Sequence, residues 1–481
     1  MDTKKLRQKI LDLAIHGKLV PQDPNDEPAS VLLERIRKEK EQLIKEGKIK
    51  APKKSKSAGD TSHYPKDVPF EVPEGWVWVR GDEIFLPMES TSPSGEFFDY
   101  IDIEAIDNKH NVVTTPKRLL VSNAPSRASR LVRKGDILFS MVRPYLRNIA
   151  RIESDGCIAS TGFYVCRCSS AIDSKYCYYL MLSDYVVNGL NQFMKGDNSP
   201  SINNNHIISW IYPLPPIAEQ RRICNRIEAL FSWVYSLEKE QAILQDYISF
   251  CRTKILDLAI HGKLVPQDPS DEPAIELLRR INPAFKPSDN LHYEGSIPSG
   301  WQIVRMGDVI DIVSGTSYQK TDIVSAGTGI RVLRGGNIQD GNILICEDDV
   351  FIDSSLANKG NTIGRGDTVI VASTGSSELI GKAAFATKDY PETQIGAFLR
   401  IIRPKSICIS EYLGLIFQTE YYKHHIKQVA KGTNINNIKS SYITEFAIPL
   451  PPLEEQRRIQ CQLKRLLSII DQITDFINGS E

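Results

Sequence analysis

Two phrases of this sequence each occur twice. Residues 10–36 read ILDLAIHGKLVPQDPNDEPASVLLERI, and residues 255–281 repeat this text with few changes, 245 positions later. The phrase LPPIAEQRRI from Leu214 returns as LPPLEEQRRI from Leu450, 236 positions later. Internal repeats of this length constrain the fold strongly, because the two copies are expected to form the same structure.

The two displacements differ, and the difference shows how the repeat is arranged. Residues 246–281 match the N-terminal residues 1–36, and residues 217–245 match the C-terminal residues 453–481. The two ends of the chain therefore correspond to one continuous central segment without a gap. This pattern indicates a cyclic pseudo-two-fold repeat that is cut open within one copy of a long central element.

The central segment has the period of a coiled-coil helix. Pro215 and Pro216 are tolerated only at a helix start, and Gly262 is a natural helix stop. The sequence therefore predicts a helix over 217–261, about 67 Å long at 1.5 Å per residue. Its seam positions alternate in steps of four and three residues and are Ile223, Ile227, Leu230, Val234, Leu237, Gln241, Leu244, Ile248, Cys251, Ile255 and Leu258.

Both chain ends carry the same seam. Neither end can bury its apolar stripe alone, so both are predicted to pack on the central helix, antiparallel because the halves are related by a two-fold repeat. An ordinary core helix would explain a few turns but not a seam that stays in phase throughout. The seam positions at the ends are Ile459, Leu463, Leu466, Ile470, Ile473 and Ile477, and Leu6, Ile10 and Leu13.

The segments between these helices look like two copies of one domain. Their edges correspond in PEGWVWVRGDEIF from Pro73 and PSGWQIVRMGDVI from Pro298, and a Gly-Asp turn leads into a strand after Lys134 and after Arg365. Trp76 and Trp301 are expected to anchor these domains, and contact with a ligand is the alternative. The predicted fold class is α+β: two similar α+β domains separated by a pair of long antiparallel helices (a coiled coil) in a pseudo-two-fold cyclic repeat.

These observations divide the chain into five predicted segments. Two are domains, and three are helical segments that include the connectors. The helical segments are 1–59 with a basic linker, 214–289 with the central helix, and 450–481 at the C-terminus. The two domains are 60–213 and 290–449.

Composition excludes several classes of protein. The formal net charge is zero and the pI is about 7.1, so affinity for nucleic acid must come from local charge. Nine cysteines without a CxxC pair suit a reducing cytoplasmic compartment. No run approaches the ~18 apolar residues of a membrane span. A soluble cytoplasmic protein is therefore expected.

A cluster of positive charge lies in the first domain. Nine basic residues and one acid, Asp136, occur between Lys117 and Arg151. Guanidinium, amide and aromatic groups contact phosphates and read base edges, so the cluster predicts a DNA-binding surface. A solvated basic face is the alternative. The predicted DNA contacts here are Lys117, Arg118, Arg127, Arg130, Arg143, Tyr145, Arg147 and Asn148.

The second domain has no equal cluster, and its candidates are mainly polar. They come from the STGSS loop, from the basic residue that follows it, and from a Lys-Gly motif that closes both domains. The candidates are Ser373, Thr374, Ser376, Ser377 and Lys382, with Lys195, Asn198 and Ser199 in the first closing motif and Lys431, Thr433 and Asn434 in the second.

The stretch KEGKIKAPKKSKS from Lys45 has no counterpart in the second half. Its composition is typical of a flexible linker. Nonspecific attraction to phosphates is an alternative role for its lysines.

Motifs for catalysis are missing from the sequence. The nearest approach to a phosphate-binding loop, GSSELIGKA from Gly375, has one residue too many and Ala383 in place of the magnesium-binding hydroxyl. His424 and His425 are adjacent, which is a poor spacing for a chelating pair on a helix. No metal site and no nucleophile–base pair is predicted, and the chain is expected to be a non-catalytic recognition subunit.

The full pattern resembles the specificity subunit of type I restriction-modification systems. The resemblance rests on two variable domains, each closed by LPP-x-x-EQ-RRI and joined by repeated long helices, and on PFEVPEGW after LLERIRKEKEQLIKEGKIK. It implies one target-recognition domain per half, each reading part of a split, asymmetric double-stranded DNA site, with the helices as a ruler. It does not assign individual base-reading residues.

The resemblance also implies partners. These are two adenine-methylating modification subunits and two ATP-dependent restriction subunits, so S-adenosylmethionine, ATP and magnesium are expected in the partners and no cofactor in this chain. A stand-alone DNA-binding scaffold or regulator without restriction partners is the alternative. Aromatic residues beside the seam would dock partners or lie under the chain's own domains: Phe231, Trp233, Tyr235, Tyr247 and Phe250.

Overall fold

The computed structural model describes residues 2–47, 49, 68–169, 171–287, 291, 293, 296–339, 341–376, 378–429 and 436–478. Contacts divide the chain into two compact units, Met1–Glu240 and Gln241–Glu481, called unit 1 and unit 2 below. The basic linker lies largely outside the described residues, as do the predicted boundaries near 59 and 289. The five-segment division stays a prediction.

The predicted central helix is confirmed. Helix α7 spans Ile217–Ile260 and continues from unit 1 into unit 2. It begins directly after the Pro215–Pro216 pair, and it ends before Gly262, whose φ of 66° is a left-handed conformation that glycine adopts without strain. No described helix is both long and apolar enough to cross a membrane.

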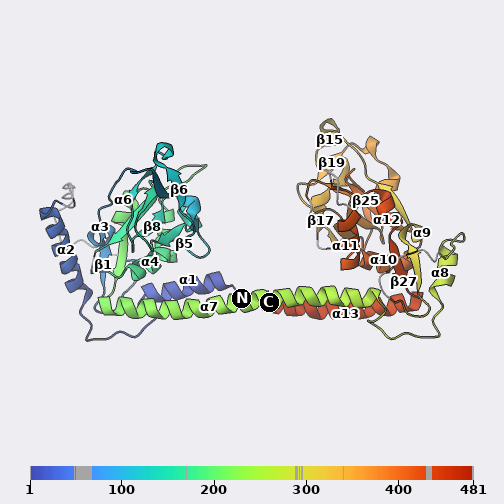
Figure 1. Cartoon of the computed structure of the whole chain (residues 1–481), viewed down its shortest axis with the longest axis horizontal. Helices are drawn as coiled ribbons and strands as arrows, with labels where there is room; N and C mark the ends of the chain where they lie inside the picture. The colour runs from blue at the N-terminus through green and yellow to red at the C-terminus, as the bar shows by residue number, and fades with distance from the viewer. Residues whose placement is uncertain are drawn as a thin grey trace. The chain divides into compact units, whose positions relative to one another are not determined.

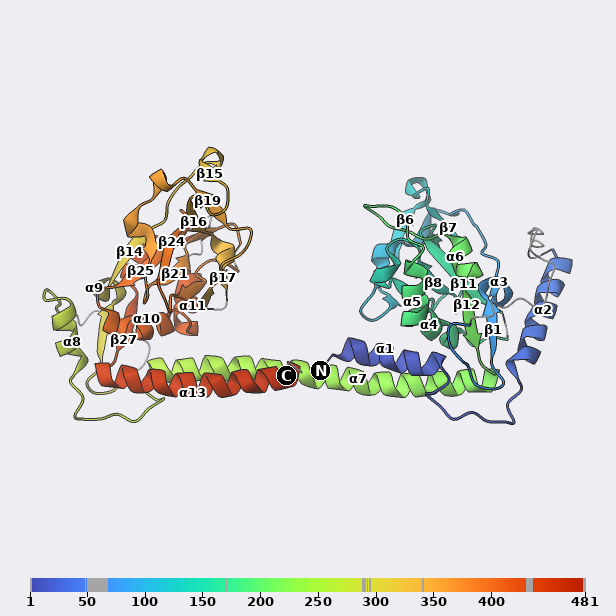
Figure 2. The same cartoon turned by 180° about the vertical axis from the view of Figure 1, so that it is seen from behind.

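In unit 1, helix α1 (Thr3–Ile15) lies along the first part of α7 (Figures 1 and 2). Arg7 Nη2 contacts Glu238 Oε2 at 2.8 Å, whereas Arg222 pairs with Asp26, which follows α1. Positions later in the N-terminal segment thus meet positions earlier in α7. The helices are antiparallel, as predicted.

In unit 2, helix α13 (Leu453–Asn478) lies along the remainder of α7 (Figure 1). Gln245 Nε2 donates to Asn478 Oδ1 at 2.9 Å, and Arg252 is ion-paired with Asp471. This pair is antiparallel too. The seam is buried at Ile223, Ile227 and Val234 but exposed at Leu237 and Leu244, so the predicted apolar stripe is only partly covered in the middle of α7.

The remaining elements of unit 1 form a mixed α/β domain with two four-stranded sheets. Their orders are β6-β3-β10-β7, in which β10 and β3 are parallel, and β2-β11-β8-β9, which is antiparallel. The elements are α2 (Ala29–Lys45), α3 (Gly81–Ile84), α4 (Ser174–Leu182), α5 (Asp184–Asn191) and α6 (Asn204–Ser209), with β1 (Val77–Arg80), β2 (Phe85–Leu86), β3 (Phe97–Ile101), β4 (Ile106–Asp107), β5 (Val112–Val113), β6 (Lys117–Leu120), β7 (Ala128–Leu131), β8 (Ile137–Ser140), β9 (Ile149–Arg151), β10 (Cys157–Ser160), β11 (Phe163–Cys168) and β12 (Ile211–Leu214).

Unit 2 repeats this arrangement. The sheet β14-β25-β21-β23 corresponds to β2-β11-β8-β9, and β15-β19-β16-β24-β20 corresponds to the other sheet with β15 added. The elements are α8 (Ala274–Ile281), α9 (Met306–Val309), α10 (Ser410–Ile416), α11 (Glu420–Val429) and α12 (Ser440–Thr444), with β13 (Gln302–Arg305), β14 (Ile310–Ser314), β15 (Ile323–Val324), β16 (Ile330–Leu333), β17 (Ile338–Gln339), β18 (Asn342–Ile343), β19 (Val350–Ile352), β20 (Thr362–Ile363), β21 (Thr368–Val371), β22 (Ser373–Thr374), β23 (Ala383–Phe385), β24 (Tyr390–Ile395), β25 (Leu399–Pro404), β26 (Asn436–Asn437) and β27 (Ala447–Leu450).

The predicted Gly-Asp turns precede central strands in both units. Gly135 and Gly366 have φ values of 92° and 91°, which a residue with a side chain rarely adopts. The strands that follow, β8 and β21, are buried at every position. The α+β fold class is therefore confirmed: a long helix lies, along the chain, between two sheet-rich domains of the same design.

The contacts between each helix pair and its domain are repeated. Trp76 Nε1 donates to Glu219 Oε2 at 2.9 Å, and Trp301 Nε1 donates to Glu455 Oε2 at 2.8 Å. Burial raises the pKa of the Glu455 carboxyl, against the opposing effect of its hydrogen bonds. Both tryptophans are buried, so they anchor their domains as predicted. Other matched contacts are Gln22–Glu219 with Gln267–Glu455, Arg222–Asp26 with Arg458–Asp271, and Tyr176–Pro213 with Tyr412–Pro449.

Candidate nucleic-acid interface

Two predicted DNA-binding regions of unit 1 lie side by side. Isolated bridges pair Val142 with Ser201 and Lys195 with Ser201. The Arg143 amide donates to Pro200 O at 2.8 Å. We call residues 142–148 and 195–201 the paired loops of unit 1. The structure thus unites the arginine-rich turn and the Lys-Gly closing motif, which are about 50 residues apart in the sequence.

The turn within the first of these loops has an unusual backbone. The short 3-10 helix Pro144–Leu146 lies between Arg143 (φ 47°) and Arg147 (φ 54°), both left-handed. This conformation costs non-glycine residues roughly 1–2 kcal/mol each. Among the described non-glycine residues, four have a positive φ, and Asn111 is another of them. A conformation this costly persists only where surrounding contacts hold it.

Those contacts come from the loop before β5 and from α5. Asn108 Nδ2 donates to Leu146 O at 3.0 Å, and Asn111 Nδ2 donates to Arg147 O at 2.8 Å. These asparagines are not among the residues that the sequence predicts as part of a site. Their signal was the run DNKHN, because asparagine and aspartate favour turns and left-handed conformations.

Arg147 and Asn148 point inward. The Arg147 guanidinium donates to Leu182 O at 2.6 Å and pairs with Asp184, and its side chain is only 16% exposed. Asn148 is buried. Arg147 therefore holds the turn against Leu182 and Asp184. The predicted DNA contacts of Arg147 and Asn148 stay predictions.

The other polar residues of the paired loops face solvent. Arg143 is exposed, and its Nη2 donates to Asn198 O at 2.7 Å, which directs the guanidinium along the second loop. Lys195, Asn198 and Ser199 are exposed as well. Tyr145 is 46% exposed. An arginine, a lysine, an amide and an aromatic ring thus share one accessible surface.

Two cations of strand β6 have acidic partners. Lys117 Nζ pairs with Asp102 at 2.5 Å and Glu104 at 3.0 Å, and these hydrogen bonds raise its pKa to about 12. Arg118 lies 3.8 Å from Asp99 and stacks over Phe97. Arg127 is exposed and Arg130 is half-buried. Nearby carboxylates therefore offset the charges of Lys117 and Arg118, so these two residues do not form a free basic patch.

Unit 2 has the same loop pair with different residues. Strand β22 pairs with β26, joining Ser373 to Asn437 and Thr374 to Asn436, at the position of the Val142–Ser201 bridge. The Ser376 amide donates to Thr374 Oγ1 at 3.2 Å, and Lys382 is exposed. Ser377, Lys431, Thr433 and Asn434 lie outside the described residues.

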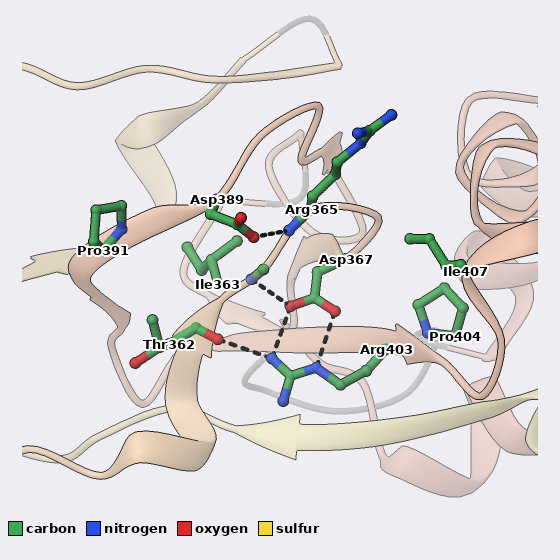
Figure 3. Close-up of a pocket in the computed structure, with 10 residues that line it drawn as sticks. Thr362, Ile363, Arg365, Asp367, Asp389, Pro391, Arg403, Pro404 and Ile407 are labelled. Carbon is green, nitrogen blue, oxygen red and sulfur yellow. Dashed lines mark hydrogen bonds and ion pairs between the residues drawn. The ribbon is translucent and has the colours of Figure 1, made fainter.

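An open cavity of about 560 Å³ lies beside β25, and an ion pair of the repeated scaffold lines it (Figure 3). Arg403 donates to both carboxylate oxygens of Asp367, at 3.0 and 2.8 Å, and to Thr362 O at 2.8 Å. Unit 1 contains the same ion pair, Arg167 with Asp136, in a buried setting. The pocket therefore adjoins a scaffold contact of the repeat and not the loop pair.

One described group of side chains could approach a cation, namely Cys346, Asp348 and Asp349. The Asp349 carboxylate already accepts hydrogen bonds from Asn337 Nδ2 at 2.6 Å and from the Cys346 amide at 3.0 Å. These bonds account for the burial of Asp349 as part of a turn. The loop pairs remain the strongest candidate sites.

Comparison with known proteins agrees with this geometry. Residues 298–478 match the family model described as "Type I restriction modification DNA specificity domain". The chain is 26% identical to the EcoAI type I restriction enzyme specificity subunit of Escherichia coli, with 99% of this chain and 91% of that protein covered. It is 31% identical to the EcoKI specificity subunit of strain K12, over 37% of this chain and 38% of that one.

A solved structure is similar over most of the molecule. It is titled "Structural basis underlying complex assembly and conformational transition of the type I R-M system". The TM-score is 0.65 at 28% sequence identity, and the match covers 86% of this chain and 95% of that one. The likeness therefore extends to both units and is not limited to the residues matched by the family model.

Proposed function

Because the chain belongs to the family of type I restriction-modification specificity subunits, we propose that it reads a bipartite, asymmetric double-stranded DNA site, one part with each unit. As a specificity subunit, it is a recognition component and not a catalytic one. The observation that carries the proposal is the loop pair, which recurs at the same place in both units with different residues. Different side chains at equivalent positions predict different half-sites.

The proposed partners follow from the same family. Two modification subunits and two restriction subunits would bind this chain and use S-adenosylmethionine, ATP and magnesium, in the cytoplasm. Trp233, Tyr235, Tyr247 and Phe250 are exposed on α7, which contradicts burial under the chain's own domains and supports a role in docking. Phe231 packs instead against Tyr179, with ring centroids 5.9 Å apart. Purification without a methyltransferase partner would favour the stand-alone scaffold.

The replacement Arg143→Ala tests the reading loop of unit 1. We expect the complex with modification subunits to bind the half-site of unit 1 about 1–3 kcal/mol more weakly, the usual loss for a bidentate base contact. The base sequence of the other half-site, which unit 2 reads, should stay the same in the methylated sites. Binding titrations and methylation-site sequencing provide the measurement.

Arg133→Ala is the matched control. Arg133 is also exposed in unit 1, but it pairs with Glu89 at 2.7 Å outside the paired loops. We expect this variant to bind like the unchanged protein. Equal losses in the two variants, or none in Arg143→Ala, would contradict the assignment of Arg143.

A half-chain of residues 1–245 tests the modular organisation. It contains all of unit 1, whose main apolar core runs from Ile10 to Val234 without a residue of unit 2. We expect it to fold and, together with modification subunits, to direct methylation to an inverted repeat of one half-site. Methylome sequencing is the measurement. A folded half-chain that stays monomeric and inactive with those subunits would refute this expectation.

A further inference from the structure

We propose that Tyr145 and Leu146, at the tip of the left-handed turn in unit 1, form a rigid wedge that enters a base step of the DNA and unstacks it. The inference rests on the proposed function, because it requires the paired loops of unit 1 to face DNA. It adds a mechanical role to base reading. The partner class is double-stranded DNA at the half-site of unit 1.

The turn is built to resist deformation. Pro144 is buried with a φ fixed by its ring, and the residues on either side of the 3-10 helix are held in left-handed conformations. The two asparagines of the DNKHN run bind the carbonyls of Leu146 and Arg147. A turn fixed at both ends can transmit force from its tip, whereas a mobile loop would yield.

The tip itself is apolar and unprotected. Tyr145 is 46% and Leu146 is 41% exposed, although both side chains sit on a rigid backbone next to polar loops. Apolar side chains that enter base steps partly unstack them, and aromatic rings stack on bases whatever the sequence. The tip offers one group of each kind.

Charge beside the tip favours DNA over protein as the occupant. Arg143 precedes the tip and is exposed, and Lys195 lies exposed on the adjoining loop. Both can contact phosphates next to an opened step. Two side chains are also a small apolar patch for a protein interface, which typically buries about 800 Å² per partner.

The wedge is confined to unit 1. The corresponding loop of unit 2 begins with Ser373, Thr374 and Gly375. Its apolar residues, Leu379 and Ile380, are half-buried, and Ile380 packs against the core of unit 2. A one-sided wedge would lower the cost of distorting the DNA at one half-site alone. Enzymes that methylate bases must extrude the target base from the stack, so an opened step near the target would assist the partner subunit.

The test uses the full chain in complex with its modification subunits. The half-sites are first identified by methylome sequencing, and 2-aminopurine then replaces each position in turn on both strands. We expect binding to raise the fluorescence at one step of the half-site of unit 1 and at no step of the other half-site. The double variant Tyr145→Ala/Leu146→Ala should lose this rise and bind that half-site about 5- to 150-fold more weakly.

Two further variants make the result specific. Tyr145→Phe as a single change keeps the ring and should retain the fluorescence rise. Leu120→Ala removes an exposed apolar side chain of β6 outside the paired loops and serves as the matched control. It should retain both the rise and the affinity.

Failure of the wedge is distinguishable from failure of the proposed function. Specific methylation without a fluorescence rise in the half-site of unit 1 would overturn the wedge and leave base reading intact. An unchanged rise in the double variant would assign the unstacking to other residues. Loss of complex assembly in that variant would make the tip a protein contact. A complex that reads no split site would overturn the proposed function and the wedge together.

Discussion

Replacing Arg167 by alanine should destabilise unit 1 by about 3–5 kcal/mol, the usual penalty for removing one partner of a buried ion pair. Arg167 donates from Nε and Nη2 to Asp136 and from Nη1 to Glu89, at 2.6 to 3.2 Å. The side chains of Arg167 and Asp136 are only 8% and 5% exposed. The variant would leave the Asp136 carboxylate buried without its counter-charge.

Unit 2 provides the internal control for this experiment. Urea unfolding gives the loss of stability, and hydrogen exchange of β8 and β11 locates it. Exchange of β21 and β25 should stay unchanged. The second change Asp136→Asn should recover much of the loss, because a neutral amide needs no counter-charge. Equal destabilisation of both units, or no recovery, would contradict a local electrostatic origin.

The equivalent change Arg403→Ala should cost less. Arg403 makes the same contact with Asp367, but its side chain is 36% exposed, so water can replace part of the lost interaction. The comparison measures how much of the effect at Arg167 comes from burial, since the two ion pairs occupy the same place in the repeat.

The scaffold could be predicted because its signals are local or repeated. The seam from Ile223 to Leu258 shows the period of α7. The displacements of the two repeated phrases match both chain ends to this helix, and the shared seam predicts that they pack on it. The Gly-Asp turns before Ile137 and Thr368 mark strand starts through a backbone requirement that sequence alone expresses. Trp76 and Trp301 were predictable as anchors because they stand in the repeated phrases PEGW and PSGW.

The candidate site was predictable only as a region. Arg147 and Arg143 look alike in the sequence, yet Asp184 takes Arg147 into the interior while Arg143 stays exposed. Lys117 belonged to a run of basic residues, but Asp102 and Glu104 neutralise it in space. The partner of a charged side chain often lies on another element, and no sequence pattern reveals it. Tertiary contacts therefore determine which of these residues face solvent.

An insertion of four residues after Glu240 should change the spacing of the two half-sites without changing either sequence. Helix α7 is continuous across the boundary between Glu240 and Gln241, and both positions lie outside the domains that carry the loop pairs. One added turn lengthens a helix by about 6 Å, and DNA rises about 3.4 Å per base pair. We expect the methylated sites to gain one or two spacer base pairs and methylation at the original spacing to be lost.

An insertion of seven residues gives a second point on the same scale. It adds about 10.5 Å, close to three base pairs, and turns the helix about 20° short of two full turns, whereas four residues overshoot one turn by about 40°. The seven-residue variant should therefore preserve the seam better and retain more stability. Alanine substitution of Lys239 and Glu240 without insertion is the control and should leave the spacer unchanged. Methylome sequencing of all three variants is the measurement. If the spacer length stays constant in the insertion variants while the half-site bases change, α7 does not set the distance between the half-sites.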